Sequence, residues 1–378
     1  MEDRKTTHNL APLALGAAII CFPGRPTIAQ VSVAKFHRDF SGALVFTFDD
    51  ALPSQLMYAA PYLDQVGLKG SFYLITRNIV DGTGAPAIGK PTTWTGWKAL
   101  ANNGHEIGSH TLTHANLTQV AADQAARELS ESALAIKDKL GITPVTLAYP
   151  FNAWNPSVAA ESRKTYMAFR DFQVGYGNVS GFANTAAAMN KYADDAVTGK
   201  RAQVGMIHGL GEPYAPMDPA VFLEHLKYCR KLADEGKLWV ARFCDLIKYQ
   251  KERDSLRVTV KAQTAVRVEF LAECPLDPVA YDFPLTLKVV YTGAVPAKAV
   301  AMRAGQAAPL PVEIQPGRIL VQAAPGPGLI TVDWSGGTGL APGQAQATPR
   351  KGSPRKFIAS GRQLQPVQGR KPTPEFLK

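Results

Sequence analysis

The chain has 378 residues, enough for two domains at the usual ~150 residues per domain. Hydrophobic residues make up 46% of it and charged residues 19%, which excludes a collagen-like, coiled-coil or wholly disordered chain. The net charge is +10, but residues 336–378 hold eight Lys or Arg and one acid, so the rest carries only +3. A basic nucleic-acid-binding protein would carry its positive charge on the folded body, so specific nucleic-acid binding is disfavoured.

The first 29 residues have the pattern of a secretory signal peptide, with Arg4 and Lys5 near the start, an apolar run over residues 10–22 and a small-residue end. The run is shorter than the ~20 apolar residues of a membrane span, so a transmembrane anchor is the weaker alternative. A lipid anchor on Cys21 is disfavoured by Ile20 before it, where a small residue is expected. We therefore expect residues 1–29 to be removed on export and the protein to be secreted or periplasmic.

Short apolar runs alternate with helical periodicity over residues 40–253. One such helical stretch is 121–140, and Asn155-Pro156 and Asp218-Pro219 have the pattern of helix starts. The predicted strands are 44–48, 71–75, 106–108, 145–148, 167–169, 204–207 and 238–241. Alternating strands and helices predict a parallel sheet, either a barrel or an open doubly wound sheet.

The hydrophobic pattern of the sequence changes after residue 255, where runs of alternating apolar and polar residues replace helical periodicity. The runs are 256–261, 266–270, 285–291, 299–303, 319–323 and 329–334. We expect a small antiparallel, sandwich-like β domain over 255–335, which either binds carbohydrate or packs against the first domain. Residues 336–378 are rich in Gly, Pro, Gln and basic residues, which predicts a disordered tail able to contact an anionic cell surface weakly.

Four polar clusters each follow a predicted strand of the first domain. They are Asp49 and Asp50, then His110 and His114, then Tyr149, Pro150 and Phe151, and last His208. In α/β folds the carboxyl ends of parallel strands meet at one face, where ligands bind. We therefore expect the four clusters to form one site.

His110 and His114 are four residues apart, a spacing that places two imidazoles on one side of a helical turn. A carboxylate added to them completes a His₂Asp set, and three protein ligands are typical of a catalytic metal site. Zinc is favoured, while Co²⁺, Ni²⁺ and Fe²⁺ suit the same ligands.

Asp49 and Asp50 offer both a ligand and a general base, because a metal-dependent hydrolase needs a proton acceptor close to the ion. The two side chains can share one site only where the chain leaves the strand, which we expect before Pro53. A histidine on the opposite side could protonate the leaving group. The pattern alone leaves open which aspartate has which role.

These residues resemble the polysaccharide deacetylases of carbohydrate esterase family four over roughly residues 43–250. The similar segments are Thr47-Phe48-Asp49-Asp50, Ser109-His110-Thr111-Leu112-Thr113-His114 and Met206-Ile207-His208. The resemblance implies a distorted (β/α) barrel of about seven parallel strands. It further implies Asp50, His110 and His114 as metal ligands, Asp49 as general base and His208 as general acid.

The third family motif departs from its common form. Many members have Arg-Pro-Pro-Tyr-Gly where this chain has Ala148-Tyr149-Pro150-Phe151-Asn152, so the resemblance is to a variant subgroup. The backbone N–H of Phe151 could still stabilise an oxyanion, since that role needs no particular side chain. Ala51 replaces the usual glycine, and the family's tryptophan motif has no clear counterpart, which leaves Trp94 and Trp154 as candidates for lining the cleft.

Arg170 is the candidate to replace the motif-three arginine that orients the base. It closes the run 167–169, whose carboxyl end should face the same cleft as the other clusters. The alternative is a surface salt bridge with Asp171, since single arginines are usually exposed.

We therefore interpret the chain as a metal-dependent hydrolase that removes acetyl groups from an acetylated polysaccharide or oligosaccharide, N-linked or O-linked. The alternative class is a non-catalytic glycan-binding relative that keeps the barrel. Such a relative would first lose Asp49, a metal ligand or His208, and all of them are present.

Overall fold

The computed structural model describes residues 30–171, 173–176, 184–212 and 216–335. The predicted signal peptide and the predicted basic tail lie outside these residues. Among the described helices, none is both long enough and apolar enough to cross a membrane.

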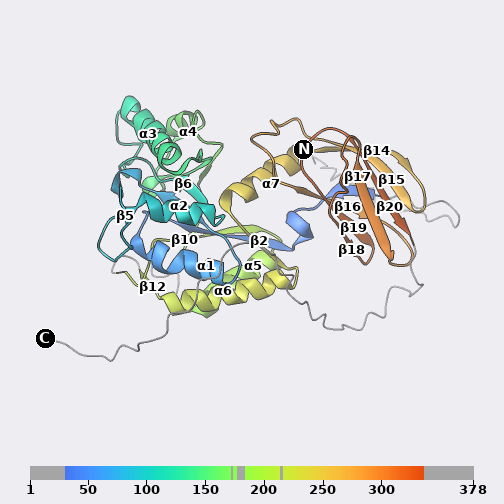
Figure 1. Ribbon diagram of the computed structural model, residues 1–378, viewed down its shortest axis with the longest axis horizontal. Coiled ribbons are helices and arrows are strands. Elements are labelled where there is room, and N and C mark those ends of the chain that lie inside the picture. Colours follow the sequence, from blue (N-terminus) through green and yellow to red (C-terminus); the bar gives the residue numbers. More distant parts are fainter. Residues whose placement is uncertain (1–29, 172, 177–183, 213–215, 336–378) are drawn as a thin grey trace, which may run out of the picture. The chain divides into compact units, whose positions relative to one another are not determined.

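A parallel sheet of eight strands forms the first part of the fold (Figure 1). In order across the sheet, seven of them are β8 (Ala168–Arg170), β7 (Thr146–Ala148), β6 (Glu106–Ser109), β3 (Ser71–Leu74), β2 (Gly42–Phe48), β10 (Ala202–Ile207) and β9 (Val174–Gly175). The eighth, β13 (Leu238–Ala241), pairs with the first half of β2, while β3 pairs with its last two residues. The parallel barrel-like sheet predicted from the sequence is confirmed.

The seven predicted strands of this part match observed strands to within two residues at each end. β2 lies inside the sheet and all seven of its residues are buried, which explains its continuous apolar sequence. β9 was not predicted, because two residues are too few to show a periodicity.

Helices connect the parallel strands. They are α1 (Ala60–Gln65), α2 (Trp94–Asn102), α3 (Ala122–Leu140), α4 (Pro156–Ser162), α5 (Ala186–Thr198), α6 (Pro219–Asp234) and α7 (Phe243–Ser255), with a π-helix η2 (Gln55–Ala59) directly before α1. α1, α5 and α6 pack together, as do α2, α3 and α4 (Figure 1). The side chains of Asn155 and Asp218 accept hydrogen bonds from first-turn amides of α4 and α6, as predicted from the sequence.

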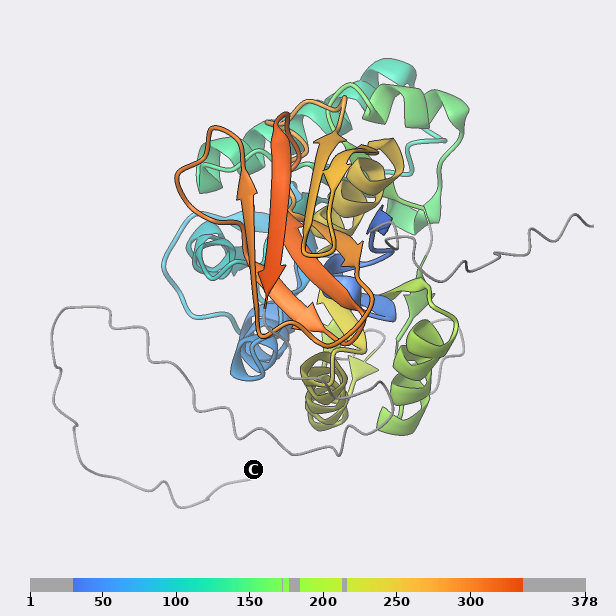
Figure 2. The same cartoon turned by 90° about the vertical axis from the view of Figure 1, so that its right-hand side faces the viewer.

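Two antiparallel four-stranded sheets form the second part of the fold (Figure 2). One contains β14 (Arg257–Gln263), β15 (Arg267–Glu273), β20 (Leu329–Ser335) and β17 (Lys298–Arg303), and the other β1 (Gln30–Val33), β16 (Leu285–Val290), β19 (Arg318–Ala323) and β18 (Val312–Gln315). Buried side chains of both sheets, such as Phe270 and Val321, share one core. The antiparallel β domain expected from the sequence is confirmed.

Two strands of this domain were not predicted. β1 pairs antiparallel with β16, so a segment that precedes the barrel in sequence completes a sheet of the C-terminal domain. β18 is four residues long. Both are too short to show the alternation on which the strand prediction rests.

His105 is a buried histidine immediately before β6. Its Nδ1 accepts a hydrogen bond from the Gly70 amide at 3.1 Å, and its Nε2 lies 3.1 Å from an Asp64 oxygen. Burial lowers the pKa of His105 to about 4, although Asp64 acts in the opposite direction. His105 is therefore uncharged in the native protein at neutral pH.

In the unfolded chain the pKa of His105 is about 6.5. Between this pH and about 4, the unfolded chain therefore binds a proton on His105 that the native protein does not bind. We predict that the free energy of unfolding falls as the pH is lowered from about 6.5 to about 4, with about 3 kcal/mol from this group. His105→Asn retains an acceptor for the Gly70 amide and removes the titrating group. Its free energy of unfolding should therefore fall less over the same pH range. Urea unfolding at pH 7, 5.5 and 4.5 measures both slopes, and identical slopes would contradict the assignment.

Candidate metal centre and active site

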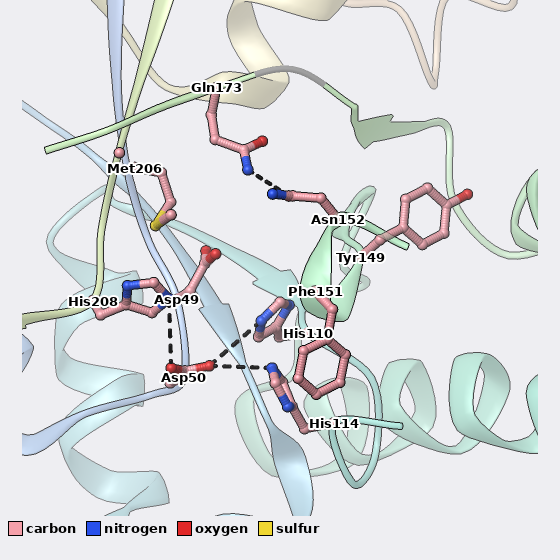
Figure 3. A pocket seen from close by; sticks show the side chains of 11 residues that line it. Asp49, Asp50, His110, His114, Tyr149, Phe151, Asn152, Gln173, Met206 and His208 are labelled. Atoms are coloured by element: carbon pink, nitrogen blue, oxygen red, sulfur yellow. Dashed lines mark hydrogen bonds and ion pairs between the residues drawn. The ribbon is translucent and has the colours of Figure 1, made fainter. Parts of the chain in front are cut away.

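The four loops expected to form one site do meet in one pocket (Figure 3). They follow β2, β6, β7 and β10, and a fifth segment, after β8, adds Gln173 and Gly175. The pocket is lined by Asp49, Asp50, His110, His114, Tyr149, Phe151, Asn152, Gln173, Gly175, Met206 and His208.

The aspartates share the pocket because the chain turns sharply after β2. Asp49 continues the ladder, with its amide bonded to the Ile207 carbonyl at 3.0 Å. Asp50 and Ala51 then adopt left-handed conformations, with φ of 74° and 56°. This turn breaks the alternation of the strand and brings both carboxylates to one side, as the sequence analysis required.

His110 and His114 do not lie on a helical turn, and that prediction was wrong. The segment after β6 is an irregular loop, with φ of 67° at Thr111 and 66° at His114. Side chains take the place of helical hydrogen bonds: the Ser109 hydroxyl accepts from the Thr111 amide at 3.0 Å, and the Thr111 hydroxyl accepts from the His114 amide at 3.1 Å. These local bonds compete successfully with a helix.

Asp50, His110 and His114 form a compact set of three ligand atoms, all within 4.8 Å of one another. The Nε2 atoms of both histidines lie 3.5 Å from Asp50 Oδ1 (Figure 3). His208 lies on the other side of the carboxylate, with its Nε2 3.8 Å from Oδ2.

The donor set fits a divalent cation. Asp50 Oδ1 is buried and has no hydrogen-bond partner among the described residues, so a cation would satisfy it. His110 Nδ1 lies 2.8 Å from the Ala148 carbonyl, a bond that requires a proton on Nδ1 and leaves the lone pair of Nε2 facing Asp50. Two imidazoles and one carboxylate leave coordination positions open, as catalytic zinc sites do.

The electrostatics of the histidines agree with this fit. Burial, followed by the nearby His110, lowers the pKa of His114 and favours its neutral, ligating form. Burial opposes charge on His110 too, but Asp49 and Asp50 outweigh it and raise the pKa of His110. Carboxylates that attract a proton to this point also attract a metal ion.

Asp49 and Arg170 form a buried two-point ion pair beside the triad. The guanidinium donates from Nη1 to Asp49 Oδ1 at 2.8 Å and from Nη2 to Oδ2 at 2.6 Å, and Nη1 also contacts the Thr47 hydroxyl at 2.9 Å. Arg170 is 1% exposed, which rules out the alternative of a surface salt bridge with Asp171. Burial alone would raise the pKa of Asp49, but Arg170, aided by His110 and His208, lowers it to about 2.

This pair also shows how strongly the sheet curls. β8 is four strands away from β2, a separation of roughly 19 Å in a flat sheet. Arg170 can reach Asp49 only because the sheet curls strongly and the side chain crosses its concave side. The Tyr73 ring supports the guanidinium at 5.2 Å, and it fits there because residue 108 is glycine, whose added Cβ would lie 2.5 Å from that ring.

Of the three predicted site residues in the turn after β7, Tyr149 and Phe151 line the pocket and Pro150 does not. Tyr149 is 1% exposed, and its hydroxyl donates to the Ser162 hydroxyl at 3.0 Å. Its ring therefore packs mainly in the core. Phe151 is 66% exposed, has a left-handed φ of 60° and places its ring 4.6 Å from that of His114. Pro150 is buried and begins the short 3₁₀ helix η4 (Pro150–Asn152).

Several pocket residues were missed by the sequence analysis. Asn152 and Gln173 hydrogen-bond to each other across the pocket, and Gln173 also accepts from Arg170 Nε at 3.2 Å (Figure 3). No sequence pattern marks such amide pairs. Neither candidate tryptophan lines the pocket: Trp94 is 8% exposed in the core, and Trp154 is half-exposed beside Tyr149.

Comparison with known proteins points to one family. The sequence profile described as polysaccharide deacetylase matches residues 40–169. A gellan lyase of Bacillus sp. is 28% identical over 364 residues, which cover 86% of this chain and 14% of that protein. The peptidoglycan-N-acetylglucosamine deacetylase PgdA of Listeria monocytogenes is 24% identical over 161 residues, 42% of this chain and 31% of that protein.

Among solved structures, the Xyl-CE4 domain of a multidomain xylanase from the hindgut metagenome of Trinervitermes trinervoides aligns with a TM-score of 0.42. The alignment has 19% sequence identity and covers 55% of this chain and 90% of that one. The chain spans less than a third of the length of the two curated relatives named above. Residues 40–169, which match the polysaccharide deacetylase profile, contain the strands that present Asp49, Asp50, His110 and His114, so this part of the chain is similar to that family.

Proposed function

We propose that the protein is a metal-dependent hydrolase that removes acetyl groups from a polysaccharide. The observation that supports this most is the pairing, in one pocket, of an Asp-His-His ligand set with a separate carboxylate fixed by an arginine. The relatives named as a peptidoglycan-N-acetylglucosamine deacetylase and a gellan lyase both support a carbohydrate polymer as substrate.

Asp50, His110 and His114 would hold the ion, and we favour zinc from the two imidazoles and one carboxylate. A divalent ion there would polarise the acetyl carbonyl and acidify the attacking water. The site needs that help, because an aspartate with a pKa of about 2 is a weak proton acceptor.

Asp49 is the proposed general base. It is ionised at any pH well above 2, and Arg170 fixes both of its oxygens, so its position is set before substrate binds. His208, on the far side of the Asp50 carboxylate, is the proposed acid that protonates the departing amine or alcohol. The Phe151 amide, in the first turn of η4 where helical acceptors are lacking, is the proposed oxyanion donor.

A non-catalytic glycan-binding relative is the alternative. The buried Asp49–Arg170 pair argues against it, because burying two charges is expensive and a binding surface gains nothing from it. We also propose export of the protein, on the signal-peptide pattern of residues 1–29.

Acetate release from acetylated chitin, peptidoglycan and xylan fragments tests the function and separates N-linked from O-linked substrates. Release from any of them supports the proposal. No release from the metal-loaded protein on the whole panel, with intact glycan binding, would favour the non-catalytic alternative.

We predict that two substitutions in the pocket separate metal binding from turnover. His110→Ala should bind little metal, because it removes one of three ligands, and chelation of the wild-type protein should likewise abolish acetate release until metal is restored. Asp49→Asn should keep its metal and lose turnover by about 10²–10⁴-fold, the usual contribution of a general base. Metal content by elemental analysis is measured beside the rate, and a fully loaded Asp49→Asn protein with wild-type turnover would place the base elsewhere.

Arg170 variants test the role of the ion pair. Arg170→Met should raise the pKa of Asp49, because burial then acts without the guanidinium, and so move the acidic limb of the pH–rate profile to higher pH. Arg170→Lys keeps the charge but cannot make two parallel hydrogen bonds, so its acidic limb should stay closer to wild type while turnover falls. Unchanged profiles and rates in both variants would leave Arg170 as scaffold.

A further inference from the structure

The ladder between β2 and β10 ends inside the catalytic pocket. Its last backbone bond joins the Asp49 amide to the Ile207 carbonyl at 3.0 Å. The chain then turns away at Asp50, with φ of 74°, and the pairing of β2 with β10 ends there. Backbone carbonyls at the end of a ladder can take their hydrogen bonds from side chains instead.

Gln55 supplies such a side-chain donor. Its side-chain Nε2 donates to the Asp49 carbonyl and, at 2.8 Å, to the His208 carbonyl. The residue is fully buried at the first position of the π-helix η2, and π-helical turns are often found at functional sites. One amide group thus joins the segments that present the proposed base and the proposed acid.

The adjacent residue makes a second connection between the same segments. The Ser54 amide donates to Glu212 Oε1 at 2.7 Å, and the Ser54 hydroxyl accepts from the Leu210 amide at 3.0 Å. Ser54 is fully buried and Glu212 nearly so. The entry into η2 is therefore fixed against β11 (Gly209–Leu210), which directly follows His208.

Glutamine at position 55 lowers the stability of the fold in a way that an apolar residue would avoid. Its Oε1 is buried and makes no hydrogen bond among the described residues. An apolar side chain of the same length would fill the space without an unsatisfied acceptor, so the two donors of the amide are what distinguishes glutamine here.

We infer that Gln55 is a positioning residue for the deacetylation proposed above, on which this inference rests. The Asp49 carbonyl belongs to the planar peptide group that also contains the Asp50 amide, so holding it fixes the backbone of both the base and a metal ligand. The His208 carbonyl is held by the same nitrogen, which sets the distance between base and acid.

The test compares two buried glutamines. Gln55→Met removes both donors at constant side-chain length, and Gln203→Met is the matched control. Gln203 lies near the start of β10, is 5% exposed and donates to the Tyr192 carbonyl, away from the pocket. The readouts are kcat and KM on an acetylated oligosaccharide, the visible absorption spectrum of the Co²⁺-loaded protein, and Tm.

Gln55→Met should lower kcat by about tenfold to a hundredfold with little change in KM, the effect of a displacement near 1 Å, and should alter the Co²⁺ spectrum through Asp50. Gln203→Met should lower Tm similarly and leave kcat and the spectrum unchanged. Gln55→Asn, whose amide is one methylene shorter and cannot reach both carbonyls, replaces Gln55→Met if the latter does not fold.

Wild-type kcat and spectrum in the Gln55 variant would overturn the inference, and so would equal losses in both variants, which would reflect destabilisation alone. If the wild-type protein releases no acetate, the proposed function fails. The Co²⁺ spectrum still tests the positioning of Asp50 in that case, because it needs no turnover.

Discussion

The buried ion pair between Asp49 and Arg170 is the interaction on which the site depends. Each charge loses its hydration in the interior, and the two parallel hydrogen bonds, with the contacts of Arg170 to Thr47, Gln173 and the Tyr73 ring, compensate for that loss. Removal of one partner from such a pair typically costs about 3–5 kcal/mol. The pair therefore couples the curvature of the sheet to the protonation state of the proposed base.

Strained backbone gathers around the same pocket. Nine non-glycine residues of the described chain have positive φ, and six of them lie in its loops: Asp50, Ala51, Thr111, His114, Phe151 and Asn152. Such conformations cost of order 1–3 kcal/mol each and persist where the surroundings enforce them. Side-chain hydrogen bonds from Ser109, Thr111 and Gln55 hold these loops in their conformations. Residues outside the ligand set therefore contribute to the rigidity of the site.

The sequence predicts the parallel sheet well, because strands buried on both faces show as uninterrupted apolar runs. The residues that follow those strands, from Asp49 to His208, lie together in the pocket for the same topological reason. Arg170 could be predicted because it ends a strand whose carboxyl end faces the pocket, where a cation beside Asp49 was missing. The path of the His110–His114 loop could not be predicted, since it depends on local hydroxyl bonds that leave no periodic signal. The roles of Gln55 and Gln173 were not predicted for a related reason. Their hydrogen-bond partners are distant in sequence, and a single glutamine forms no recognisable sequence pattern.

The pairing of β1 with β16 has a consequence for synthesis on the ribosome. Residues 30–33 emerge before the barrel, yet their partners at 287–290 emerge only after the whole barrel has been made. β1 therefore stays without its partner strand until late in synthesis, and a chain that lacks β1 leaves β16 with an open edge able to pair with other chains. A recombinant protein started at residue 40 would keep every pocket residue and still lack this edge strand, so it would be more prone to aggregation than its intact pocket suggests.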